Sequence, residues 1–170
     1  MLNQVIGDLI NNQINKEFFS AYLYLDMANY YAEKGLNGFA NWMNVQAQEE
    51  RDHAILFTTY LQNNDIPVRL STIDAPGREY ADFKAPLTAS LEHERYVTSL
   101  IHTIYGEAVK ANDFRTVQFL DWFVKEQGEE EKNIDDLIKR YDLFGTDAKG
   151  LYMLDAELGA RVYAAPSLVL

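Results

Sequence analysis

The sequence contains no cysteine, which excludes disulfides, thiolate metal sites, iron–sulfur clusters and cysteine nucleophiles together. Proline and glycine are also scarce, at 4 and 9 of 170 residues, which favours long uninterrupted helices. Apolar residues nevertheless make up 48% of the chain. That content suffices for one sizeable core, and we expect residues 1–170 to form a single domain.

Positive charge is scarce as well, with 15 lysines and arginines against 26 acids and a net charge of -11. This balance argues against a nucleic-acid partner, because phosphate binding requires a basic patch. It is compatible with attracting cations, although solubility alone accounts for such a charge.

No apolar run approaches the ~18 to 20 residues of a membrane span. The first residues show no basic segment followed by an apolar run, so we expect no signal peptide. We therefore expect a cytoplasmic protein without membrane contact.

Four long stretches carry apolar residues at helical spacing, at about 5–33, 39–63, 83–110 and 114–141, and a shorter one spans 147–159. Short breaks make the first and second helices antiparallel, and likewise the third and fourth. The connection between the second and third helices, about 18 residues at 65–82, can extend ~60 Å, whereas a helix of ~27 residues is ~40 Å long. The sequence therefore predicts an all-α four-helix bundle with one long crossover and a short fifth helix.

A glutamate stands on each long helix where an apolar core residue is expected. In steps of seven, the stripes are Ile10-Glu17-Tyr24, Met43-Glu50-Phe57, Leu87-Glu94-Ile101 and Phe123-Glu130-Leu137. Seven residues are almost two turns, so each trio shares a face. A buried, unpaired carboxylate is costly and must be neutralised or paired. All four acids lie near the helix midpoints, which predicts a common cation at the bundle centre.

The segment Glu50-Arg51-Asp52-His53 places a carboxylate and an imidazole one turn apart. Alone, such a pair is more often exposed at the surface, but bundle sites for paired iron or manganese use this motif with glutamates from the other helices. Glu50 can bridge two metals. Glu17 and His53 would complete the ligands of one metal, and Glu94 and Glu130 those of the other. This ligand set suits iron or manganese, with zinc as a competitor.

The fourth helix carries a run of acids around Gln127, and such runs are usually solvated faces. Here Gln127 and Glu130 lie on inward stripes. Glu126 and Glu129 are one turn apart and can flank the centre together with Glu49, which predicts a third, more polar metal position. Tyr24 is interpreted either as a core tyrosine with a satisfied hydroxyl or as a hydrogen-bond or electron donor at the metal site, and these roles are compatible. His93 and His102 do not align with the acid stripes, and we expect neither to bind metal.

This pattern resembles the bacterial non-haem ferritins over nearly the whole chain. The matching residues are Glu17, Tyr24, Glu49-Glu50-x-x-His53, Glu94 and Glu126-Gln127-x-Glu129-Glu130. The resemblance implies a first iron site at Glu17, Glu50 and His53. It implies a second at Glu50, Glu94 and Glu130, and a third at Glu49, Glu126, Glu129 and Glu130. It implies that Gln127 either binds iron weakly or contacts a residue that binds iron.

The resemblance implies that the protein would be a ferroxidase and an iron store. Fe(II) would be oxidised by O2 or H2O2 at a di-iron centre within one chain and kept as hydrated ferric oxide. The store would be a hollow homo-oligomer of about 24 chains, since closed symmetry is usual for homo-oligomers. The short fifth helix would line a four-fold contact, and no haem would be bound.

Several rival interpretations fit less well. A haem-type bacterioferritin has a second Glu-x-x-His on the fourth helix and a methionine before the histidine of the second, where this chain has Gln127…Glu130 and Asp52. Rubrerythrin-like proteins require cysteines. The DNA-protecting relatives build their site between subunits, whereas this chain holds a complete set. A helical interaction module would need basic residues opposite the glutamates, and the inward stripes contain none. A soluble di-iron oxidase remains the alternative, although no substrate pocket is evident in the aromatic-rich core.

Overall fold

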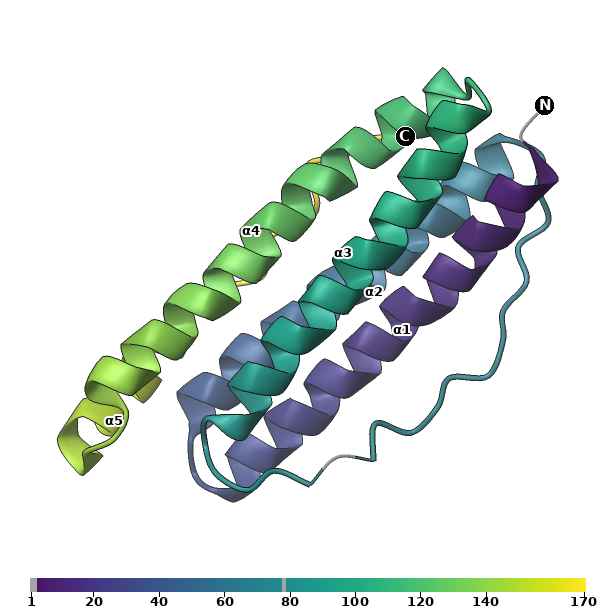
Figure 1. The fold of residues 1–170 in the computed structure, drawn as a ribbon. Coiled ribbons are helices and arrows are strands. Elements are labelled where there is room, and N and C mark those ends of the chain that lie inside the picture. The colour runs from purple at the N-terminus through teal and green to yellow at the C-terminus, as the bar shows by residue number, and fades with distance from the viewer. Residues whose placement is uncertain (1–2, 78) are drawn as a thin grey trace.

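The structure is a computed structural model that describes residues 3–77 and 79–170, and over that range it is helical without strands. The helices are α1 (Gln4–Glu33), α2 (Asn37–Asn63), α3 (Ala85–Lys110), α4 (Phe114–Phe144) and α5 (Ala148–Leu158). The first four form a bundle and α5 lies at one of its ends (Figure 1). The predicted fold class is therefore confirmed. No helix of the described residues is long and apolar enough to cross a membrane.

The connection between α2 and α3 runs along the outside of the bundle, so that α2 and α3 point in the same direction (Figure 1). Two asparagines of α1 hold this segment. Asn11 Nδ2 donates to Pro67 O at 3.2 Å and its Oδ1 accepts from Arg69 N at 2.7 Å. Asn15 Nδ2 donates to Thr72 O at 2.9 Å. The long crossover is thus anchored to the bundle by hydrogen bonds between these side chains and its backbone.

Side-chain caps and left-handed residues define the helix ends. The Asn3 side chain caps α1 by accepting from Val5 N at 2.9 Å, and Asp113 caps α4 by accepting from Thr116 N at 3.2 Å. Gly35 has φ +77 in the turn between α1 and α2, a region that favours glycine. α4 continues three residues beyond the predicted end at 141, because no helix breaker occurs before Gly145.

A polar layer divides the apolar core into two halves. One half includes Leu23, Met27 and Phe39, and the other includes Ile10 and Phe57. The buried residues of the layer between them are Gln13, Glu17, Gln46, Glu50, His53, Glu94, Gln127 and Glu130. The two apolar halves hold the helices together, and the layer concentrates buried polar groups at mid-bundle.

α5 is fixed at the end of the bundle by a cap on α2. Asp155 Oδ1 accepts from Gly38 N at 2.8 Å and from Phe39 N at 3.0 Å. A side chain at Gly38 would place its Cβ 1.6 Å from Asp155 O, so this close approach requires glycine. Leu154 and Leu158 are buried in the same contact. The apolar stripe of the fifth helix is therefore covered at least in part by its own chain.

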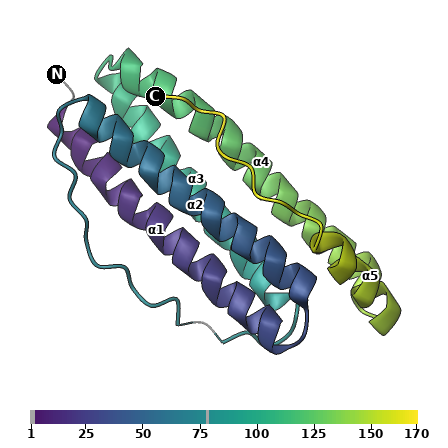
Figure 2. The same ribbon diagram turned by 180° about the vertical axis from the view of Figure 1, so that it is seen from behind.

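The C-terminal tail, residues 160–170, turns back from α5 and runs along α2 and α4 (Figure 2). The Tyr163 hydroxyl donates to Asp52 of α2. Trp122 Nε1 of α4 donates to Ser167 Oγ at 2.9 Å. The tail therefore contacts both helices beside the polar layer.

Candidate metal centre

The four core acids come from four different helices and are all buried. Their exposed fractions are 1% for Glu17, 1% for Glu50, 0% for Glu94 and 4% for Glu130. His53, one turn beyond Glu50 on α2, is 2% exposed. Each acid lies near the middle of its helix, and side-by-side helices match at their centres whichever way they run. The heptad positions therefore bring the predicted residues into one dry layer.

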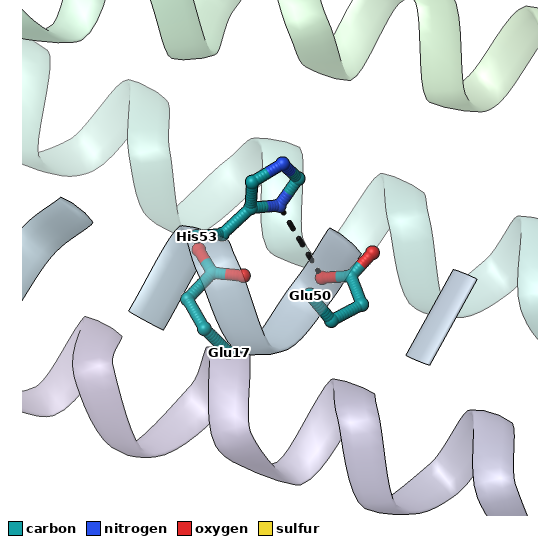
Figure 3. A group of neighbouring side chains, drawn as sticks. All are labelled: Glu17, Glu50 and His53. Carbon is teal, nitrogen blue, oxygen red and sulfur yellow. Dashed lines mark ion pairs between the residues drawn. The ribbon is translucent and has the colours of Figure 1, made fainter. Parts of the chain in front are cut away.

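Glu17, Glu50 and His53 form a compact group whose ligand atoms all lie within 4.8 Å of one another. Figure 3 shows the two carboxylates and the imidazole pointing toward one another from α1 and α2. His53 Nδ1 lies 3.6 Å from Glu50 Oε2. Gln13 Nε2 donates to Glu17 Oε1 at 2.7 Å, whereas Glu17 Oε2 is buried without a hydrogen-bond partner in the described part of the chain. Because an unpaired buried oxygen is costly, this atom fits a cation ligand.

Glu94 is held by a tyrosine and an amide on the other side of the layer. The Tyr24 hydroxyl donates to Glu94 Oε1, and Gln127 Nε2 donates to Glu94 Oε2 at 3.2 Å. Glu94 belongs to neither of the compact ligand groups among the described residues. The charges of Glu50 and Glu130 nevertheless add to the effect of burial in raising the pKa of Glu94. Tyr24 and Gln127 thus both contact a candidate ligand.

Glu50 and Glu130 are joined by an amide that bridges α2 and α4. Gln46 Nε2 donates to Glu50 Oε1 at 3.1 Å and to Glu130 Oε2 at 2.7 Å. One NH2 group therefore donates to the carboxyl groups of two candidate ligands on different helices. These contacts place Glu130 beside Glu50.

A second compact group extends toward the seam between α2 and α4. Ligand atoms of His53, Glu126 and Glu130 lie within 4.8 Å of one another. Glu126 is half-buried, and burial is the main cause that raises its pKa. We call these three residues the outer group. It contains two of the four acids predicted for a third metal position.

The other two acids of that predicted position are engaged elsewhere. Glu49 Oε2 accepts from Arg161 Nη2 at 2.5 Å. Glu129 is mostly exposed, with its Oε1 3.2 Å from Lys125 Nζ. The structure therefore assembles the third position only in part, because an arginine of the tail holds Glu49 and solvent surrounds Glu129.

Burial and one ion pair shift the pKa values of the residues in the layer. Burial, assisted by Glu50, raises the pKa of Glu17 to about 8, and the same causes raise the pKa of Glu130 to about 8. Burial raises the pKa of Glu94 well above its usual range. Burial opposes protonation of His53, but the adjacent charge of Glu50, 3.6 Å away, outweighs it and raises the pKa of His53 to about 10. These raised pKa values favour the protonated forms of Glu17 and Glu130 at pH 7, and a bound cation would displace those protons.

The two histidines predicted not to bind metal, His93 and His102, belong to neither ligand group among the described residues. His93 Nε2 lies 2.7 Å from Ser20 Oγ. His102 is exposed on α3.

Three residues that contact the layer were not identified in the sequence. Gln13 and Gln46 each stand four residues before a core glutamate on the same helix, a spacing that puts both side chains on one face. That spacing was a usable signal. Arg161 offered none, because it lies beyond the last helix in a segment without periodicity.

Comparison with known proteins gives a consistent result. A family model described as a ferritin-like domain matches residues 7–144. A probable bacterial non-heme ferritin-like protein of Haemophilus influenzae is 36% identical over 159 residues, covering 94% of this chain and 96% of that protein. A bacterial non-heme ferritin of Campylobacter jejuni is 34% identical over 155 residues, covering 91% and 93%. The solved open pore ferritin from Archaeoglobus fulgidus superposes with a TM-score of 0.93 at 39% identity, covering 95% of this chain and 100% of that one.

Proposed function

Because this chain belongs to the family of ferritin-like domain proteins, we propose that it is a non-haem ferritin that oxidises Fe(II) and stores it as hydrated ferric oxide. The observation that carries the proposal is the buried layer of four glutamates and one histidine, with an unpartnered oxygen on Glu17. A bundle interior tolerates so many acids only if something neutralises them. Cations bound between the helices meet that requirement.

Ferrous iron is the substrate, and the chain supplies its ligands. Glu17 and His53 hold one ion and Glu94 and Glu130 the other, with Glu50 between them. Gln46 and Gln13 keep the carboxylates in place while the layer is empty. Binding displaces protons from the acids and from His53, and the ligands then carry the negative charge that favours the ferric state.

The oxidation balances with two ions per reaction. Two Fe(II) lose one electron each, and O2 takes up both electrons with two protons to give H2O2. When H2O2 is the oxidant, two electrons and two protons yield two molecules of water. The Tyr24 hydroxyl holds Glu94 in the metal-free centre and is placed to donate a hydrogen bond or an electron.

Glu126 and Glu130 continue the route away from the centre as a third iron position, with Glu49 and Glu129 as its further ligands. Glu126 already lies with His53 and Glu130 in the outer group. Its partial exposure suits a position through which iron passes after oxidation.

We further propose that copies of this chain assemble into a closed shell of about 24 subunits in the cytoplasm. An apolar groove of about 680 Å³ crosses α1 and α2, and exposed Tyr22 and Leu25 contribute to its wall. Tyr152 and Met153 of α5 are also largely exposed. Apolar surfaces of this kind favour contacts between subunits. A haem-type relative has a methionine at the position of Asp52. Here the Asp52 carboxylate accepts a hydrogen bond from the Tyr163 hydroxyl, which favours a shell without haem.

The test is aerobic addition of ferrous iron to the purified assembly. Ferric iron formation is followed by absorbance, and size-exclusion chromatography then measures the iron that co-elutes with protein. Storage predicts rapid oxidation with hundreds of ions retained in a large soluble particle. Rapid oxidation with iron precipitating outside the protein would favour the soluble oxidase instead. Absence of accelerated oxidation would contradict both.

A further inference from the structure

The seam between α2 and α4 is covered by the C-terminal tail. No Cα of α2 comes within 8 Å of a Cα of α4, so side chains and the tail fill the space between these two helices. The tail follows the seam along its length (Figure 2). It is fastened to α2 through Tyr163 and to α4 through Ser167. Whatever leaves the metal layer on this side passes the tail.

Arg161 is the charged residue by which the tail reaches the layer. Its Nη2 donates to Gln46 Oε1 at 2.9 Å and to Glu49 Oε2 at 2.5 Å. Its Nη1 donates to Trp42 O at 3.3 Å, and its guanidinium lies 4.2 Å from the centre of the Trp42 ring. Asn41 Nδ2 donates to Arg161 O at 2.9 Å. Side chain and backbone are thus both held by the N-terminal half of α2.

These contacts determine how the side chains of Gln46 and Glu49 are oriented relative to the metal layer. Because Arg161 occupies the oxygen of the Gln46 amide, the NH2 group of that amide faces Glu50 and Glu130. Because Arg161 also binds Glu49, that carboxylate lies outside the outer group. Only 21% of the arginine side chain and 19% of the glutamate side chain are exposed, so water screens this pair little.

We propose that Arg161 is a positioning residue that competes with a metal cation for Glu49, so that the outer group gains this ligand only when the guanidinium moves aside. A guanidinium and a divalent cation on one carboxylate repel each other. The Arg161–Glu49 ion pair therefore weakens metal binding at the outer group. The tail thereby favours occupation of the central layer first. The inference rests on the proposed function, because it takes the outer group for an iron position.

The test uses the full-length assembly freed of metal, with Co²⁺ as a probe that binds oxygen and imidazole ligands and resists oxidation by air. Calorimetric titration separates tight central binding from weaker outer binding. Arg161→Gln removes the charge, and we expect outer affinity to rise about tenfold while central affinity is unchanged. Arg161→Lys keeps a cation near Glu49 and should remain within about threefold of the wild type.

Two further variants separate this role from a general effect of the tail. Arg140→Gln removes another arginine, one that pairs with Glu157 of α5 and does not contact Glu49, and it should leave both affinities unchanged. In a Glu49→Gln background, Arg161→Gln should raise outer affinity much less, because the competed carboxylate is gone and only direct repulsion between guanidinium and metal is relieved. An equal rise in both backgrounds would overturn a role through Glu49.

The outcomes distinguish the two proposals. Central binding with an unchanged or lower outer affinity in Arg161→Gln would overturn the competition while leaving the proposed function intact. Absence of cobalt from the central layer of the wild type would overturn the proposed function, and this inference with it. Circular dichroism and size-exclusion chromatography check that each variant folds and assembles. Should Arg161→Gln fail to assemble, a rise in outer affinity on Glu49→Gln alone would overturn the competition, because that carboxylate is the ligand competed for.

Discussion

Gln46 Nε2 on α2 donates to Glu130 Oε2 on α4 at 2.7 Å, across a seam where the two backbones do not approach each other. The same nitrogen donates to Glu50 Oε1 at 3.1 Å. One buried amide therefore links two candidate ligands of the metal layer. Without metal, this amide satisfies part of the hydrogen-bonding need of the two buried carboxyl groups. Bound metal ions would satisfy the same oxygens, so the contribution of Gln46 to stability should depend on metal.

Replacing Gln46 by alanine should destabilise the metal-free protein more than the metal-loaded one. Without metal, Glu130 and Glu50 lose a buried donor, which costs about 1–3 kcal/mol. With Co²⁺ bound, the metal satisfies these oxygens and the difference should shrink. Chemical denaturation with and without cobalt measures both values. Gln48→Ala is the matched control, since this glutamine is exposed on the same helix, and an equal loss in both metal states would contradict the argument.

Replacing Glu50 by alanine should abolish rapid oxidation of added ferrous iron, lowering the initial rate by at least about 100-fold. Glu50 lies in the compact group with Glu17 and His53 and is the proposed bridge between two ions. Helix content by circular dichroism should be unchanged, because the two apolar halves of the core remain. Glu92→Ala, at an exposed position of α3, serves as the control. Wild-type kinetics in the Glu50 variant would refute the di-metal assignment.

Periodicity was sufficient to predict the bundle because each long helix buries one continuous stripe. The crossover followed from chain length, since about 18 residues reach farther than a helix of the bundle is long. The end of α4 was predicted three residues early because the last turn has no distinctive pattern before Gly145. Helix boundaries depend on single residues and are harder to predict than helices themselves.

The site was predictable where it is built from helical stripes. Glu17, Glu50, Glu94 and Glu130 stand on core positions, so their convergence followed from the spacing alone. Arg161 was not predictable, because its place depends on how the tail folds back after α5. Contacts made by an irregular segment are set by tertiary structure, which no local pattern encodes. The position of Glu49 outside the outer group follows from that contact.

Replacing Glu129 by alanine should spare metal binding in the central layer and affect only turnover after the first additions of iron. Glu129 is mostly exposed and its carboxylate pairs with Lys125, so its loss leaves the buried ligands undisturbed. The first addition of two Fe(II) per chain should be oxidised at the wild-type rate, and repeated additions at a rate changed about two- to tenfold. Stopped-flow absorbance over successive additions measures this. Loss of all iron binding would show that the central and third positions are not separate.

Metal binding to the central layer should release protons at pH 7 and tighten as the pH rises. Burial raises the pKa of Glu17 and of Glu130 to about 8, so in the empty protein both carboxyls are mostly protonated at pH 7. A metal ion must displace these protons, and raising the pH removes them in advance. Affinity for Co²⁺ should therefore increase by up to about tenfold per pH unit for each proton released, and the increase should lessen above about pH 8. Calorimetric titration in buffers of different ionisation enthalpy counts the protons, and a count near zero at pH 7 would contradict the raised pKa values.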